Sequence, residues 1–117
     1  MQIKIIKCLR DNYSYIIIDN NNNACVVDPS ESDPVIKYLE ENKINLKFIL
    51  NTHHHYDHVG GNKELKKKYN AKVLGYINDK ERIPEIDIFL KNKEIWNTDA
   101  FKFQIFHIPG HTSGHIC

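Results

Sequence analysis

Short apolar segments separated by polar turns begin the chain. Residues 2–6 and 13–19 are rich in β-branched and aromatic side chains, which is typical of strands. The four asparagines at 20–23 predict a turn, after which residues 24–28 return as a third strand. Pro29 ends this strand because proline has no N–H to donate to a sheet. We therefore expect an antiparallel meander at the N-terminus.

A helix is predicted next. Ser32 and Asp33 offer a capping side chain, and Pro34 suits the first helical position. Apolar side chains at helical spacing over residues 35–39 then predict one buried face. We expect the helix to end near position 42.

The remaining pattern continues to alternate strands with helices. Residues 46–50 predict a buried strand, residues 63–69 a helix and residues 72–75 another strand. Residues 101–108 alternate apolar with polar positions, which predicts a further strand. The segment 77–97 is mixed and receives no assignment. Strands alternating with helices indicate an α/β layered domain.

Composition narrows the function classes. A length of 117 residues allows one domain at most, and 41% apolar with 26% charged residues is ordinary for a globular protein. A net charge of +1 gives no footprint for nucleic acid binding. The longest apolar run, at 15–18, is far short of the roughly 18 residues that a membrane span needs. We expect neither a nucleic acid nor a membrane as partner.

The three cysteines argue against a disulfide framework. Their number is odd and no C-x-x-C occurs, so neither a disulfide scaffold nor a cysteine zinc site is predicted. Cys25, in an apolar run, is interpreted as a small buried hydrophobe. No signal peptide pattern precedes the first strand. The simplest compartment is the reducing cytoplasm.

A first histidine cluster follows the strand at 46–50. His53 and His55 are two residues apart, so they project to the same side of an extended backbone and can bind one metal ion. Asp57 and His58, before a glycine pair that permits a sharp bend, could face a second ion. His54 points the other way, which favours a packing or hydrogen-bonding role. The alternative is a histidine-rich surface turn without metal.

Ligand chemistry favours catalysis at this cluster. Imidazole and carboxylate groups without cysteine suit zinc, iron or manganese. They are more typical of an open catalytic site than of a closed structural one.

A second cluster supplies one more ligand. His111 lies between Gly110 and Gly114, which allow the backbone to approach a site closely. It completes a set of three for the ion held by His53 and His55, the arrangement of catalytic zinc.

Residues near His111 are predicted to orient neighbouring groups or to pack, without binding metal themselves. Thr112 and Ser113 could orient nearby groups through hydrogen bonds. His115 is expected to make a structural hydrogen bond, and His107 to pack within its strand.

These motifs resemble those of a known superfamily. Thr52-His53-x-His55-x-Asp57-His58 and Gly110-His111-Thr112 resemble the metal motifs of the metallo-β-lactamase superfamily. Within it, the segments DNYSY, THHHYDHVGGN and HTSGHIC, at 11–15, 52–62 and 111–117, resemble the glyoxalase II family of hydroxyacylglutathione hydrolases.

The resemblance implies an αββα sandwich with two divalent metal ions at one edge of its sheets, zinc first and iron or manganese as alternatives. Asp28 would support the site without ligating metal. Asp57 would also orient the attacking water or accept its proton. The implied reaction is hydrolysis of S-lactoylglutathione, a glutathione thioester, to lactate and glutathione. The implied ligands are His53, His55 and His111 for the first ion, and Asp57 and His58 for the second.

Other parts of the family pattern are missing. A bridging aspartate, a further histidine ligand and a basic helical region that binds glutathione all follow the HTSGHIC segment in the family. We therefore expect residues 1–117 to be the N-terminal part of the catalytic domain, with its C-terminal remainder absent, and to be inactive or only weakly active alone. An iron-dependent persulfide dioxygenase, a lactonase and a non-catalytic metal-binding fragment are the alternatives.

Overall fold

A six-stranded mixed sheet forms the centre of the computed structural model, which describes residues 2–9, 12–98 and 101–117. The pairs β1–β2 and β2–β3 are antiparallel, whereas β3–β4, β4–β5 and β5–β6 are parallel. A separate antiparallel pair is formed by β7 and β8. The strands are β1 Gln2–Cys8, β2 Asn12–Ile18, β3 Asn23–Val27, β4 Asn45–Leu50, β5 Lys72–Tyr76, β6 Ile88–Leu90, β7 Ile95–Asn97 and β8 Lys102–Gln104.

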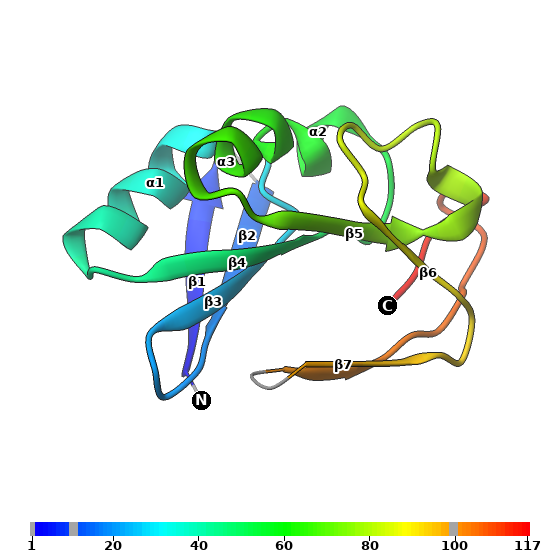
Figure 1. Ribbon diagram of the computed structural model, residues 1–117. Helices are drawn as coiled ribbons and strands as arrows, with labels where there is room; N and C mark the ends of the chain where they lie inside the picture. The colour runs from blue at the N-terminus through cyan, green and yellow to red at the C-terminus, as the bar shows by residue number, and fades with distance from the viewer. Residues whose placement is uncertain (1, 10–11, 99–100) are drawn as a thin grey trace.

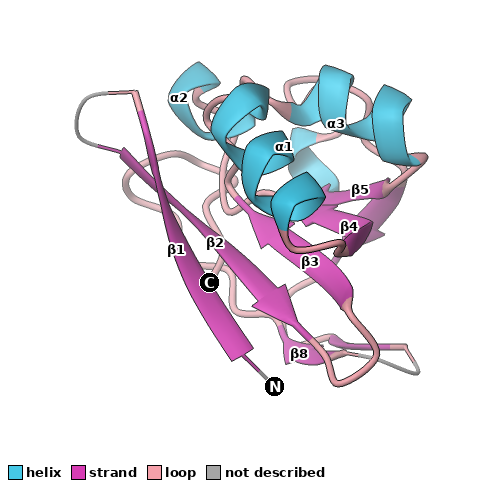
Figure 2. Cartoon of the chain, turned by 90° about the vertical axis from the view of Figure 1, so that its left-hand side faces the viewer, coloured by secondary structure: helices cyan, strands magenta, loops and turns pink. Residues whose placement is uncertain are grey.

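Helices cover one face of the sheet, and β7–β8 lies on the other (Figures 1 and 2). The parallel connections β3–β4 and β4–β5 run through these helices, whereas β5 and β6 are joined through the 3₁₀ turn that follows β5. The layered α/β architecture expected from the sequence is therefore confirmed. The helices are α1 Ser32–Glu41, α2 Tyr56–Val59 and α3 Asn62–Tyr69, with a 3₁₀ turn, η1, at Ile77–Asp79.

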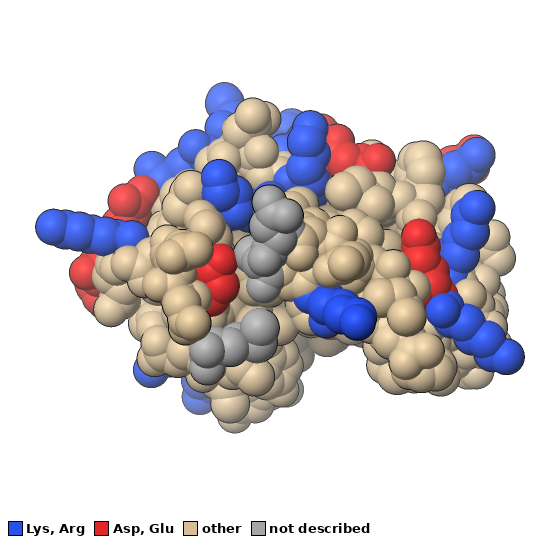
Figure 3. All heavy atoms as spheres, turned by 60° about the horizontal axis from the view of Figure 1, so that its bottom comes forward, with Lys and Arg blue, Asp and Glu red and all other residues tan. Residues whose placement is uncertain are grey.

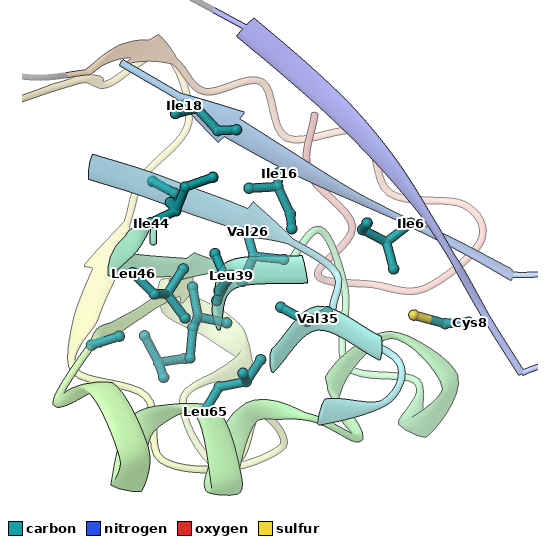
Figure 4. Close-up of a cluster of buried hydrophobic side chains, with 14 of the residues drawn as sticks. Ile6, Cys8, Ile16, Ile18, Val26, Val35, Leu39, Ile44, Leu46 and Leu65 are labelled. Atoms are coloured by element: carbon teal, nitrogen blue, oxygen red, sulfur yellow. The ribbon is translucent and has the colours of Figure 1, made fainter. Parts of the chain in front are cut away.

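The first core lies between the sheet and the helices (Figure 4). Ile16 and Val26 face it from β2 and β3, while Leu39 of α1 and Leu65 of α3 meet them; all four are fully buried. This packing explains the helical spacing of apolar residues in α1.

The second core lies between the sheet and β7–β8. Cys25, Leu74 and Phe101 are buried in it, and Trp96 packs edge-on against Phe48 at 4.8 Å between ring centroids. Burial raises the pKa of the Cys25 thiol to about 12. Cys25 is thus an inert hydrophobe, as predicted.

The start of α1 differs from the prediction. Glu31 is the residue before the helix, and within the described chain it provides no side-chain cap. The Ser32 hydroxyl instead donates to Glu64 Oε2 at 2.7 Å. The predicted cap at Ser32 is wrong because this side chain joins α1 to α3.

The predicted strand at 101–108 is also too long. Only Lys102–Gln104 is strand β8, and His107 forms an isolated bridge with Ile116 further on. The ring of His107 stacks on Tyr76 at 4.3 Å, in agreement with the packing role predicted for it. The alternation of apolar and polar residues over 101–108 reflects burial of one face of this segment. That burial continues beyond the residues of β8 that pair with β7.

The surface carries mixed charge. On the face in Figure 3, basic and acidic side chains lie scattered among larger uncharged areas, in keeping with the net charge of +1. Within the described ranges, no helix has the length and apolar character needed to cross a membrane.

A surface ion pair at the β5–β6 edge gives a pH-dependent prediction. Asp87 accepts hydrogen bonds from Lys66 Nζ at 2.8 Å and from the Val73 N–H at 2.9 Å. Burial raises the pKa of Asp87, but these hydrogen bonds outweigh it and hold the pKa below its usual value. A carboxyl with a depressed pKa stabilises the fold above its unfolded pKa of about 3.9 and loses this effect as pH falls through the folded value. We expect Asp87→Asn to lower the free energy of unfolding by about 1 kcal/mol at pH 7.

Urea unfolding of both proteins at several pH values measures this. The difference between wild type and Asp87→Asn should shrink below about pH 4. A difference that stays constant down to pH 2 would contradict the assignment to the carboxylate charge.

Candidate metal centre

The two histidine clusters meet at the end of β4. Residues 51–58 directly follow this strand. The segment 105–117 lies beside them, and its Ile116 N–H donates to the Thr52 carbonyl at 2.8 Å. The C-terminal segment accordingly lies between the central sheet and β7–β8 (Figure 1). Segments far apart in the chain thus bring their histidines to one place.

Three imidazoles converge there. His53, His55 and His111 each offer a ring nitrogen, and these nitrogens all lie within 4.8 Å of one another. His53 is only 4% exposed, while His111 is exposed. Burial, followed by the charge of His58, lowers the pKa of His53 to about 4. His53 is therefore neutral at pH 7, which is the form that binds a metal ion.

The tautomer of His53 follows from its neighbours. Thr52 Oγ1 lies 2.5 Å from Asp28 Oδ2 and 2.9 Å from His53 Nδ1. A carboxylate only accepts, so the single hydroxyl proton of Thr52 goes to Asp28, and the hydroxyl oxygen must accept from His53 Nδ1–H. The lone pair of His53 is then on Nε2. This nitrogen is buried and has no hydrogen-bond partner among the described residues, as a ligand awaiting a cation would be.

Asp28 belongs to a second group. Its carboxylate, with His53 and His58, presents atoms within 4.8 Å of one another. The hydrogen bond and charge of Asp28, whose Oδ2 lies 3.3 Å from His58 Nδ1, raise the pKa of His58 against the effect of burial. Asp28 also accepts the Thr52 N–H at 2.7 Å. The structure thus places Asp28 beside the histidines, at ligand distance as well as in a supporting position.

Asp57 lies beside His58 on the four-residue helix α2. Its Oδ2 is 3.7 Å from His58 Nε2. Among the described residues, neither group of three potential ligands contains Asp57. The helix precedes the glycine pair, so Asp57 and His58 are presented by a helical turn and not by a bend at the glycines.

The N-terminal hairpin holds Asp57 in place. The Asn12 amide donates to the Asp57 carbonyl at 3.2 Å and to its Oδ2 at 3.3 Å. The Ser14 hydroxyl donates to the Asp28 carbonyl at 2.7 Å, and the Ser30 hydroxyl donates to the Asp57 carbonyl. These contacts give a physical reason for the DNYSY segment, whose first residue, Asp11, lies outside the described residues.

A buried amide pair supports the same loop. Asn62 Nδ2 donates to Asn51 Oδ1 at 2.6 Å and to the Pro84 carbonyl at 3.3 Å, while Asn51 Nδ2 donates to the His58 carbonyl at 3.2 Å. Both asparagines are fully buried. The sequence analysis did not identify this pair. One asparagine directly follows a buried strand and the other follows a glycine pair, and these positions are a signal that could have found it. Gly61 is needed beside it because a Cβ there would lie 3.0 Å from the Pro29 carbonyl oxygen.

The other predicted residues lie close to the cluster. His54 turns toward Asp79, with 3.8 Å between Nδ1 and Oδ2. The ring of His115 is 4.9 Å from that of His53, so it borders the three converging histidines. The Thr112 hydroxyl is buried and has no partner within the described ranges. The supporting roles of Thr112 and His115 stay predictions.

Comparison with known proteins agrees with this geometry. The profile of the metallo-beta-lactamase superfamily matches residues 9–95, about three quarters of the chain. The chain belongs to the metallo-beta-lactamase superfamily. The resemblance to this superfamily is thereby confirmed, and the first histidine motif lies within the matched residues.

Solved structures share the metallo-beta-lactamase fold. The BLEG-1 B3 metallo-beta-lactamase superposes with a TM-score of 0.90 at 21% identity, covering 98% of this chain and 65% of that one. ETHE1 from Myxococcus xanthus gives a TM-score of 0.81 at 25% identity, covering 99% of this chain and 52% of that one.

Curated relatives are closer in sequence. The chain is 67% identical over 118 residues to the hydroxyacylglutathione hydrolase of Pelagibacter ubique, covering 100% of this chain and 49% of the relative. It is 41% identical to the enzyme of the same name from Methylococcus capsulatus, covering 99% of this chain and 46% of the relative. The chain spans about half the length of the curated relatives it matches.

Proposed function

We propose that the protein carrying this chain hydrolyses the thioester of S-lactoylglutathione, giving lactate and glutathione. The observation that carries this proposal is the convergence of His53, His55 and His111 in a chain 67% identical to a hydroxyacylglutathione hydrolase. The cytoplasm is its proposed compartment, and a glutathione thioester is its proposed small-molecule partner.

We propose two divalent metal ions, with zinc as the first candidate and iron or manganese as alternatives. The residues fit such ions because imidazoles and a carboxylate meet around the unpartnered Nε2 of His53. The proposed ligands are His53, His55 and His111 for one ion, and Asp57 and His58, with Asp28 within reach, for the other. When bound, the ions polarise a thioester carbonyl and lower the pKa of water.

The chain's own residues orient these groups. Thr52 and Asp28 fix the tautomer of His53, so that Nε2 faces the cluster. Asn12 holds the carboxylate of Asp57, which in this proposal orients the attacking water or accepts its proton. A thiolate is a good leaving group, so the chemistry requires little acid assistance.

Substrate selectivity tests the proposal. We expect the protein, expressed from its native reading frame and loaded with zinc, to hydrolyse S-lactoylglutathione and to leave a β-lactam intact. The loss of the ultraviolet absorbance of the thioester measures this, and we expect a rate at least about 10⁶-fold above the uncatalysed one. The His55→Ala variant is the inactive control. Oxidation of glutathione persulfide with no thioester hydrolysis would replace this function by a dioxygenase.

A further inference from the structure

Asp79 is a wholly buried carboxylate that the proposed reaction does not use. It ends the 3₁₀ turn η1, which directly follows β5. Its backbone carbonyl accepts the N–H groups of Arg82 and Ile83 at 2.9 and 3.0 Å, which fixes the turn. A buried charge costs free energy unless it is paired. The groups around Asp79 therefore indicate which part of the structure it stabilises.

Asp79 pairs with Arg82 and lies between the two histidine loops. Its Oδ1 forms an ion pair with the guanidinium of Arg82. Its Oδ2 faces His54 Nδ1 at 3.8 Å, which is longer than a hydrogen bond. Gly114, three residues after His111, packs directly on the carboxylate, because a Cβ at this position would overlap all three carboxyl atoms.

We propose that Asp79, through Arg82, is a positioning residue that holds the loop of His111 at the end of β5, beside His53 and His55. This inference rests on the proposed metal centre. It assigns a role to a segment in which the sequence shows no motif.

Ser113 is the point at which the His111 loop is held. Arg82 donates to the Ser113 hydroxyl at 3.0 Å. His107 Nε2 lies 2.8 Å from the Ser113 carbonyl, which can only accept, so this nitrogen donates. His107 in turn stacks on Tyr76, the last residue of β5. The end of β5 therefore reaches Ser113 from two sides.

The loop needs such support because it is irregular. Residues 109–114 form turns and bends without a paired strand, and the His111 side chain is exposed. Its imidazole is therefore positioned by contacts of neighbouring residues. Without them, binding a metal ion would also have to order the loop, and the affinity would fall.

Asp79→Asn tests the inference, since it keeps the size of the side chain and removes the charge that pairs with Arg82. We expect metal affinity, measured by competition with a chelator, to fall about tenfold. We also expect the visible absorption spectrum of the cobalt-loaded protein to change, because His111 would no longer be held at a fixed position. Asp87→Asn is the matched control: it removes a hydrogen-bonded carboxylate whose partners, Lys66 and Val73, lie outside both loops. It should leave affinity and spectrum as in the wild type.

Ser113→Ala provides a second variant that should fold even if Asp79→Asn does not, because this side chain is exposed. We expect it to weaken metal binding severalfold. If both variants fold and match the wild type in affinity and spectrum, the inference is wrong, although the proposed function stands. If the wild type binds metal no better than His55→Ala, the metal centre itself is wrong.

Discussion

Replacing His55 by alanine is expected to remove most of the bound metal, whereas replacing His54 by alanine should leave the metal content nearly unchanged. The ring nitrogen of His55 lies within 4.8 Å of those of His53 and His111, so the substitution leaves two histidines of three. His54 instead turns its Nδ1 toward buried Asp79. Losing one of three ligands lowers metal affinity by far more than losing a neighbour that only packs.

The two variants control each other. Each removes one imidazole, and the positions are adjacent in the chain. Elemental analysis of protein purified without chelator gives the metal bound per chain, and circular dichroism shows whether each variant folds. Equal loss of metal in two folded variants would rule out this assignment of ligands.

Much of the fold could be predicted because its elements have local patterns. The bounds of β1 to β5 and of α3 were placed within two residues of those in the structure, since each has its own apolar periodicity. The segment 77–97 has no such pattern. Its strands β6 and β7 are three residues long, and β6 is defined by pairing with β5, where Leu74 lies opposite Ile88. Pairing with a distant neighbour leaves no local signature.

The same distinction applies to the site. The spacing of His53, His55 and His111 with their glycines was enough to predict that they meet. The groups that hold them were harder to predict, because Asn62 pairs with Asn51 and Asp79 contacts Gly114, and in each case the partner is not a neighbour in the sequence. Asp79 also lies in the segment without an assigned pattern.

Thr52 offers the sharpest test of how the protein prepares a ligand. Its hydroxyl accepts from His53 Nδ1 and donates to Asp28, so it keeps the proton on Nδ1 and the lone pair on Nε2. Thr52→Val preserves the shape of the side chain and the backbone N–H that donates to Asp28, but it removes both hydroxyl contacts. We expect metal affinity to fall by about 10–100-fold, the range typical when the partner of a ligating histidine is lost.

Two controls separate this effect from a general loss of a hydroxyl group. Thr52→Ser restores the hydroxyl and should bind metal nearly as tightly as the wild type. Thr98→Val removes a hydroxyl that accepts the Phe101 N–H at 3.1 Å, between β7 and β8, and should leave affinity unchanged. Nitrogen chemical shifts of the metal-free protein report the tautomer directly: the proton of His53 should be on Nδ1 in the wild type and should redistribute to Nε2 in Thr52→Val. If the Thr52 hydroxyl keeps the proton on His53 Nδ1, its removal must allow that proton to move to Nε2. A valine variant that keeps both the tautomer and the metal affinity would therefore show that Thr52 does not orient His53.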